Sequence, residues 1–188
     1  KDRTTAKWSE GIIREYLLPP FEEAIKAGAK SVMVNSADIN GIPGLVNKKW
    51  LVNVLRNELG FEGIIVTDWA DIYKLNEVHK TSPTLKHAVK SSIDAGVDMS
   101  MVPNDYKFSQ LLIELVNEGE ITEERIDKSV TRILNLKYDL GLFENPVTPN
   151  FEYSKVSSQE FEKVSYQVAA EGITLLKNQD NVLPLSIN

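Results

Sequence analysis

Residues 60–69 read Gly-Phe-Glu-Gly-Ile-Ile-Val-Thr-Asp-Trp. The apolar run at residues 64–66 is rich in β-branched side chains, which is typical of a parallel strand that is covered on both faces. The run ends abruptly at Asp68 and Trp69. Because α/β barrels build their active sites at the C-terminal ends of the strands, a carboxylate and an indole at this position are candidate site residues.

Asp68 has a second interpretation, because aspartate is also a favoured N-cap residue of helices. In that case Asp68 caps the helix that follows, and Trp69 packs in the core. A strand followed by Asp and Trp leaves both interpretations open.

Two further apolar segments, residues 31–36 and 97–102, are expected to be strands. Between the strands, apolar side chains recur at three- and four-residue spacing, which predicts helices. Strands that alternate with helices predict an α/β fold with a parallel sheet. The pattern suits either a (β/α)8 barrel or a doubly wound sheet and does not choose between them.

Local residue chemistry predicts where several helices begin and end. Ser9 and Thr122 are placed to cap helix N-termini. Glycines that suit left-handed helix ends follow four of the helical patterns, at Gly28, Gly60, Gly96 and Gly141.

Pro146 and Pro149 break the helical pattern and predict a linker between two domains. Beyond them, residues 160–171 are expected to form a helix and residues 173–176 a strand. The predicted domain organisation is a first domain, a linker and the start of a second domain, at residues 1–143, 144–159 and 160–188.

Composition excludes several classes of protein. Of the 188 residues, 42% are hydrophobic and 26% are charged, which is typical of a folded globular protein. The formal net charge is -6 and no basic stripe is interleaved with aromatics, so nucleic acid is not an expected partner. No apolar run is long enough to span a bilayer. The chain begins with Lys1 rather than Met, and we expect it to be a piece of a longer protein.

Motifs for other chemistries are missing from the sequence. There is no cysteine, no glycine-rich phosphate loop and no G-x-S-x-G serine hydrolase motif. His79 and His87 lack the spacing of metal ligands and are expected to be surface or packing residues. The sequence therefore predicts neither a metal site nor a cofactor site.

Residues 60–69 closely resemble the nucleophile motif of glycoside hydrolase family 3, whose usual form is GFxGxVxSDW. Other segments are similar to the family in the family's own order. They are residues 20–29, 32–33, 40–43, 95–99, 125–127, 132–134, 141–143, 175–178 and 183–185. Together these segments extend over nearly the whole chain, which makes the resemblance highly specific.

The resemblance implies a fold and an activity. The chain would carry the last three strands of a (β/α)8 TIM-like barrel, then a linker and the start of an α/β sandwich domain. The activity implied is that of a retaining, exo-acting β-glycosidase, foremost a β-glucosidase acting on a small carbohydrate without metal or organic cofactor. The chain would need the rest of its barrel and its second domain, and a periplasmic or secreted location is favoured.

The resemblance also implies roles for individual residues. Asp68 would be the catalytic nucleophile, Trp69 a wall of the subsite for the terminal sugar, and Met33 a residue facing that sugar. A retaining glycosidase needs two carboxyl groups about 5–5.5 Å apart, one of which protonates the departing oxygen. That acid, a Glu, is expected downstream of residue 188, and a sugar-binding Lys-His pair upstream of residue 1. Four other carboxylates are therefore not assigned to the acid role: Glu62, Asp71, Asp94 and Asp98.

Two residues depart from the family pattern. Thr67 replaces the commoner Ser and keeps a hydroxyl. Ser36, a candidate substrate-binding residue, stands where the family often has a Tyr whose hydroxyl could bond the nucleophile. The site is therefore expected to be wider, or another loop is expected to supply the contact with the nucleophile. The pair Asn35 and Ser36 is similar to that of polysaccharide-degrading relatives, which favours glucan or xyloglucan oligosaccharides.

Alternative functions remain open. They are a β-xylosidase or a single-domain β-N-acetylglucosaminidase of the same family, and a non-catalytic sugar-binding relative, because a fold does not guarantee activity. The single-domain enzymes usually have Asp-Asp at the nucleophile and no second domain. Trp69 and residues 175–178 argue against them.

Overall fold

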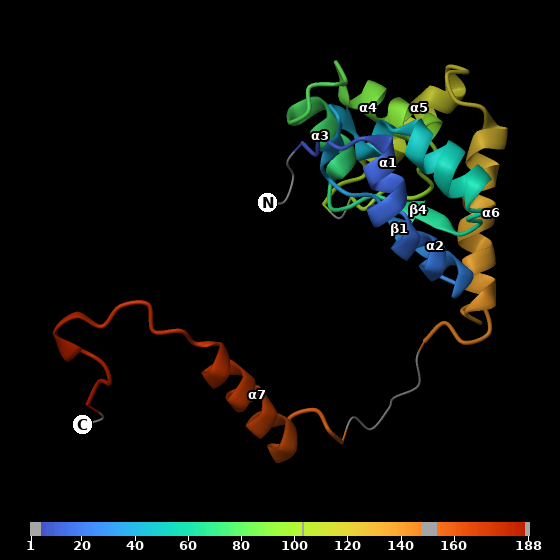
Figure 1. Cartoon of the computed structure of the whole chain (residues 1–188). Coiled ribbons are helices and arrows are strands. Elements are labelled where there is room, and N and C mark those ends of the chain that lie inside the picture. Colours follow the sequence, from blue (N-terminus) through green and yellow to red (C-terminus); the bar gives the residue numbers. More distant parts are fainter. Residues whose placement is uncertain (1–4, 103, 148–153, 187–188) are drawn as a thin grey trace. The chain divides into compact units, whose positions relative to one another are not determined.

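The structure is a computed structural model that describes residues 5–102, 104–147 and 154–186 (Figure 1). The chain forms two compact units, Lys1–Pro146 and Val147–Asn188. Residues 148–153 of the predicted linker lie outside the described residues, as do the last two residues of the predicted second domain. No helix in the described ranges is both long enough and apolar enough to cross a membrane.

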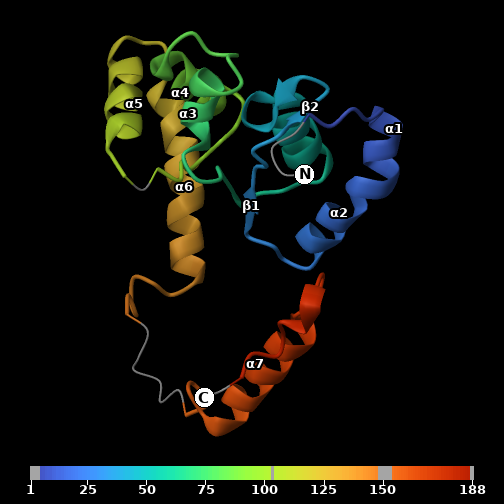
Figure 2. The same ribbon diagram turned by 90° about the vertical axis from the view of Figure 1, so that its left-hand side faces the viewer.

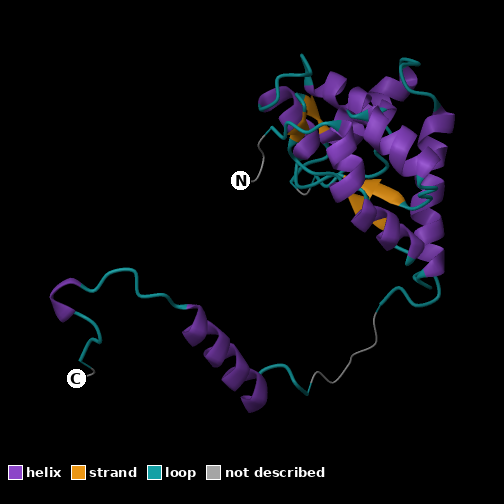
Figure 3. Ribbon diagram, in the orientation of Figure 1, coloured by secondary structure: helices purple, strands orange, loops and turns teal. Residues whose placement is uncertain are grey.

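A short parallel sheet lies at the centre of the first unit (Figure 3). β1 (Ser31–Met33) pairs with β4 (Ile64–Val66) so that Ser31 faces Ile64 and Met33 faces Val66. The start of this pairing requires glycine at position 63, because a Cβ there would lie 2.3 Å from the Lys30 carbonyl oxygen. A small antiparallel hairpin follows β1 and consists of β2 (Asp38–Ile39) and β3 (Ile42–Pro43).

The strand expected at residues 97–102 is reduced to one parallel bridge between Val66 and Met99. The Ile65 carbonyl accepts from the N–H groups of both Asp98 and Met99, at 2.9 and 3.1 Å. Further along, the Met101 N–H donates to the Thr67 side-chain hydroxyl instead of a backbone carbonyl. A side chain thus takes the place of the next ladder bond, and the backbone pairing stops.

Helices surround this sheet (Figures 1 and 2). In the first unit, in chain order, they are α1 (Glu10–Ile12), η1 (Ile13–Leu17), α2 (Pro19–Lys26), η2 (Gly44–Val46), η3 (Lys49–Glu58), α3 (Asp71–Glu77), α4 (Leu85–Asp94), α5 (Lys107–Asn117) and α6 (Glu123–Asp139). α3 packs on α4, α4 packs on α5, and α6 lies against β4. The core between them is apolar and includes Phe61, Ile65, Ile72, Leu75, Val89 and Val97.

The predicted helix signals are confirmed. The hydroxyls of Ser9 and Thr122 accept from the N–H groups of Ile12 and Arg125, at 3.3 and 3.2 Å. All four glycines that were predicted to end helices have positive φ angles, between 67° and 108°.

The second unit contains α7 (Gln159–Gly172) and η4 (Gln179–Asn181). The helix predicted at residues 160–171 is therefore confirmed. The strand predicted at residues 173–176 is not formed, because a strand needs a hydrogen-bonded neighbour and residues 154–186 contain no second strand.

Candidate active site

Asp68 and Trp69 lie just beyond the C-terminal end of β4. Met33 ends the neighbouring strand at the same edge of the sheet, because it pairs with Val66. Asp68 is partly buried, whereas Met33 and Trp69 are 56% and 52% exposed. These three predicted residues are thus brought to one edge of the sheet, where Met33 and Trp69 are exposed. Ser36, the fourth predicted site residue, is only 7% exposed.

Both carboxylate oxygens of Asp68 have hydrogen-bond donors. Oδ1 accepts from the Trp69 backbone N–H at 2.6 Å, and Oδ2 accepts from the Ser36 hydroxyl at 2.9 Å. From the sequence, either a wider site or a contact from another loop was expected in place of the tyrosine. The structure shows that the Ser36 hydroxyl itself reaches the carboxylate.

Asp68 does not cap a helix with its side chain. α3 begins at Asp71, and its N-cap residue is Ala70, which has a left-handed φ of 54° and makes no side-chain cap. The backbone carbonyl of Asp68 accepts from the Asp71 N–H at 3.3 Å. The helix-cap interpretation of Asp68 is wrong, and the Trp69 side chain is 52% exposed rather than buried in the core of the described residues.

The buried Thr67 fixes the backbone that carries Asp68. Its hydroxyl donates to the Asp68 carbonyl at 2.8 Å and accepts from the Met101 N–H at 2.9 Å. Its own N–H donates to the Met99 carbonyl at 3.0 Å, and the Ala70 N–H donates to the Met101 carbonyl at 2.8 Å. Hydrogen bonds at both ends of residues 67–70, the segment that carries Asp68, therefore hold it to residues 99–101.

Beneath the site lies a polar cluster that sequence reasoning missed. The Ser36 hydroxyl also contacts Oδ2 of Asp71, and Oδ1 of Asp71 contacts the Lys74 ammonium. Lys74 Nζ donates in addition to the Trp69 carbonyl at 3.1 Å. The only local signal for this cluster is the three-residue spacing of Asp71 and Lys74, which places them on one side of a helix.

His79 is half-buried, as a packing residue would be, and its Nε2 lies 3.2 Å from the Ser36 carbonyl oxygen. His87 is exposed. Across the described parts of the chain, no group of three or more His, Asp or Glu side chains is arranged to hold a metal ion.

A second buried carboxylate, Asp98, anchors β4. Its side chain is 0% exposed and accepts from the Ile65 N–H at 3.0 Å and from Ser129 Oγ at 2.7 Å. Arg56 and Arg132 donate to it at 2.5 and 2.9 Å. Burial lowers the pKa of Arg56 to about 10, against the raising effect of Asp98. Asp98 is thus fully engaged in the core.

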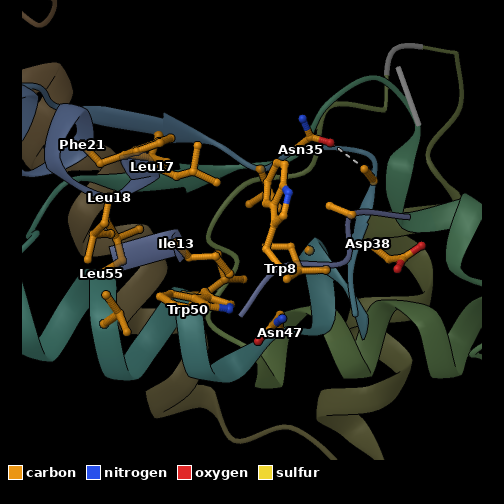
Figure 4. Close-up of a pocket in the computed structure, with 18 of the residues that line it drawn as sticks. Trp8, Ile13, Leu17, Leu18, Phe21, Asn35, Asp38, Asn47, Trp50 and Leu55 are labelled. Atoms are coloured by element: carbon orange, nitrogen blue, oxygen red, sulfur yellow. Dashed lines mark hydrogen bonds between the residues drawn. The ribbon is translucent and has the colours of Figure 1, made fainter. Parts of the chain in front are cut away.

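An apolar pocket of about 660 Å³ opens between β1, η3 and the helices from α1 to α2 (Figure 4). Ile13, Leu18 and Phe21 gather around it together with Trp8 and Trp50 (Figure 4). An apolar surface of this kind is typical of a face that packs against further protein.

Comparison with known proteins decides the family. Residues 1–136 match the model of the glycosyl hydrolase family 3 N-terminal domain. The chain belongs to glycoside hydrolase family 3. The family recognised from the motifs is therefore confirmed.

Curated relatives of this family 3 chain are named as glycosidases. It is 48% identical to the lysosomal beta glucosidase of Dictyostelium discoideum, over 100% of the chain and 23% of that protein. It is 35% identical to a beta-xylosidase of Formosa agariphila, over 96% of the chain and 26% of that protein. The chain thus spans about a quarter of the length of the relatives that it matches.

Solved structures confirm the fold class. The chain superposes on the β-glucosidase of Listeria innocua with a TM-score of 0.76 and 34% identity, covering 97% of this chain and 25% of that one. That enzyme has also been solved in complex with glucose, and a mutant of it with laminaribiose. The N-terminal domain of such enzymes is a TIM barrel, so the α/β prediction of a partial barrel is confirmed and the doubly wound alternative is excluded.

Proposed function

We propose that this chain supplies the nucleophile and part of the sugar subsite of a retaining, exo-acting β-glucosidase. The observation that carries the proposal is the geometry of Asp68, a partly exposed carboxylate at the C-terminal end of β4 that accepts from the Trp69 N–H and the Ser36 hydroxyl. Hydrogen-bond donors of this kind stabilise an ionised carboxylate, the form that attacks. The substrate would be an oligosaccharide with a terminal non-reducing β-D-glucosyl residue, and the names of the relatives support this class.

The reaction would proceed in two displacements. In the first, an Asp68 oxygen bonds to the anomeric carbon while the glycosidic oxygen departs, taking a proton from an acid that lies outside this chain. In the second, water attacks the same carbon, the bond to Asp68 breaks and the carboxylate is restored. Two inversions give net retention. No organic cofactor or metal is needed for these steps.

The exposed side chains around Asp68 would bind the sugar. Trp69 offers a flat apolar face on which the C–H surface of a pyranose can stack. Met33, at the end of the adjacent strand, would face the same sugar. Ser36 would act near the substrate through its contact with Asp68.

The chain would work as part of a longer polypeptide. We propose that residues 1–143 belong to the catalytic barrel, that residues 144–159 form a linker, and that residues 160–188 begin an α/β sandwich domain. The apolar pocket beside β1 would then be covered by the rest of the barrel. One curated relative is named a periplasmic β-glucosidase and another a lysosomal one, which supports a non-cytosolic location, periplasmic or secreted.

A β-xylosidase is the second candidate, because relatives with that name are 35% identical to this chain. The two candidates differ in the hydroxymethyl group of glucose, which xylose lacks. The ratio of kcat/KM for aryl β-glucosides and aryl β-xylosides in the full-length protein distinguishes them. Hydrolysis of aryl N-acetyl-β-glucosaminides alone would indicate a β-N-acetylglucosaminidase. Sugar binding without hydrolysis would indicate a non-catalytic relative.

Covalent trapping tests the proposal directly. A 2-fluoro glucoside with a good leaving group should label the full-length enzyme, because the fluorine destabilises the oxocarbenium-like transition states and slows breakdown of the intermediate. Peptide mapping should place the added mass on Asp68. Asp68→Asn, which keeps the size and removes the charge, should abolish most turnover without unfolding the protein. A label on another carboxylate, or a product of inverted configuration, would refute the assignment.

A further inference from the structure

Asp71 lies directly behind the residue that touches the nucleophile. We propose that Asp71 is a positioning residue, which controls Asp68 through the hydroxyl of Ser36. This inference rests on the proposed role of Asp68. It is based on one hydroxyl oxygen, Ser36 Oγ, that contacts Oδ2 of Asp68 at 2.9 Å and also Oδ2 of Asp71.

Burial separates Asp71 from any substrate. Asp71 is 1% exposed and Ser36 is 7% exposed, whereas Asp68 is partly exposed beside the open face of Trp69. Asp71 therefore cannot touch a sugar, and whatever it contributes to catalysis must pass through its neighbours. The neighbour that links it to Asp68 by side-chain contacts is Ser36.

The number of protons on Ser36 limits what the cluster can do. A serine hydroxyl carries a single proton, so it can donate to only one of the two carboxyl groups at a time. Lys74 lies on the far side of Asp71, and its ammonium contacts Oδ1 of Asp71 and donates to the Trp69 carbonyl at 3.1 Å. The two carboxyl groups thus share one hydroxyl, and a positive charge compensates the inner one.

The proposed reaction changes the balance between these two acceptors. Before attack, Asp68 is a carboxylate, and the Ser36 hydroxyl can donate to it and hold its orientation. In the glycosyl intermediate Asp68 is a neutral ester and a weaker acceptor, since hydrogen bonds to ionised groups are the stronger ones. The hydroxyl then turns toward Asp71, and turns back when water releases the sugar. The proton stays on Ser36 throughout, and only its direction changes.

A merely structural role predicts something different for Asp71. Together with Lys74 and the Trp69 carbonyl it could simply hold the start of α3. Removing it would then lower stability, with an effect on catalysis that is independent of Ser36. The positioning role instead predicts that the catalytic effect of Asp71 disappears once the Ser36 hydroxyl is gone.

A double-mutant cycle in the full-length enzyme tests this difference. The variants are Ser36→Ala, Asp71→Asn and the double variant, assayed with an aryl β-glucoside whose poor leaving group makes formation of the glycosyl ester rate-limiting. Asp71→Asn should lower kcat by about 10²-fold, because misplacing a reacting group by 1 Å can cost that much, with KM little changed. The double variant should be no slower than Ser36→Ala. The matched control is Asp94→Asn, which neutralises an exposed aspartate paired with Lys90, and it should leave kcat unchanged.

Each outcome bears on the proposal. The positioning role would be overturned if the two single-variant losses in kcat multiply in the double variant, or if Asp71→Asn leaves kcat unchanged. In either case, hydrolysis by the wild-type enzyme and the covalent label on Asp68 would still support the proposed function. Absence of hydrolysis by the wild-type protein would overturn both. If Asp71→Asn fails to fold, the cycle is repeated with Asp71→Asn combined with Lys74→Met, which removes both charges, since loss of a whole buried pair is tolerated better than loss of one partner.

Discussion

Asp98→Asn removes a buried negative charge from the core without changing the size of the side chain. In the folded protein the carboxylate accepts four hydrogen bonds, from Ile65, Arg56, Ser129 and Arg132. The neutral amide keeps one acceptor oxygen and presents an NH2 group where the other oxygen stood. At least one donor therefore loses its acceptor, and the guanidinium groups lose their counter-charge.

The size of the effect follows from the burial of the partners. The side chains of Asp98 and Arg56 are 0% and 10% exposed, and that of Arg132 is 30% exposed. Breaking a buried ion pair by removing one partner costs about 3–5 kcal/mol. Burial already lowers the pKa of Arg56 to about 10, and Asp98 opposes that shift, so the carboxylate offsets part of the cost of burying the guanidinium. Because asparagine retains one acceptor, we expect about 3 kcal/mol of destabilisation of the barrel.

Urea unfolding of the full-length protein, followed by tryptophan fluorescence, measures this loss as a shift of the first cooperative transition. Asp94→Asn is again the matched control, because its exposed pair with Lys90 should be worth about 0–1 kcal/mol. A loss of less than about 1 kcal/mol in Asp98→Asn would refute the reasoning, since it would mean that Arg56 finds other partners or water.

Two further predictions concern the site and the chain as a whole. Trp69→Ala should lower kcat/KM about tenfold through loss of sugar stacking. Its loss of folding stability should be far smaller than the roughly 3–5 kcal/mol that replacing a core tryptophan costs, because Trp69 is 52% exposed. An unchanged kcat/KM with a large fall in melting temperature would contradict this. The chain of residues 1–188 expressed alone should associate and show no glycosidase activity, because no strand among the described residues covers the outer edge of β1 and an apolar pocket of about 660 Å³ is open beside it. Light scattering that reveals a monodisperse, cooperatively melting monomer would contradict that expectation.

The helices could be read from the sequence because their signals are local. The N-cap of α6 and the apolar stripe of α5 depend on residues within one or two turns of each other, so one window of sequence contains the whole argument. The helical pattern that was expected to end at Gly60 forms as the π-type helix η3 (Lys49–Glu58). Composition and periodicity do not distinguish these backbone types.

The strands were predicted less well because strand pairing is not local. Residues 97–102 have an apolar, strand-like composition, but Thr67 replaces a backbone acceptor and the ladder ends after one bridge. Residues 173–176 form no strand because a neighbour must supply the hydrogen bonds. An apolar run indicates that a segment can be buried, but it does not indicate which acceptor will face each backbone N–H group.

The site residues also differ in how well the sequence predicts them, according to whether their signal is local. Asp68 and Trp69 adjoin one strand, so a contiguous motif was enough to single them out. The contacts of Ser36 with Asp68 and Asp71 join residues that are 32 and 35 positions apart. Nothing in the neighbourhood of Ser36 in the sequence indicates which carboxylates fold back onto it.

The left-handed conformation of Ala70 restricts how the loop after β4 can change its length. A residue other than glycine in this conformation costs about 1–2 kcal/mol, and here it turns the chain so that Trp69 faces outward while Asp71 faces inward, two positions later. Inserting or deleting one residue would carry Asp71 away from Ser36. Barrel enzymes commonly acquire new substrates by lengthening their strand-to-helix loops. Given the proposed role of Asp71, we expect this loop to keep its length and the other loops around the barrel mouth to vary with the substrate.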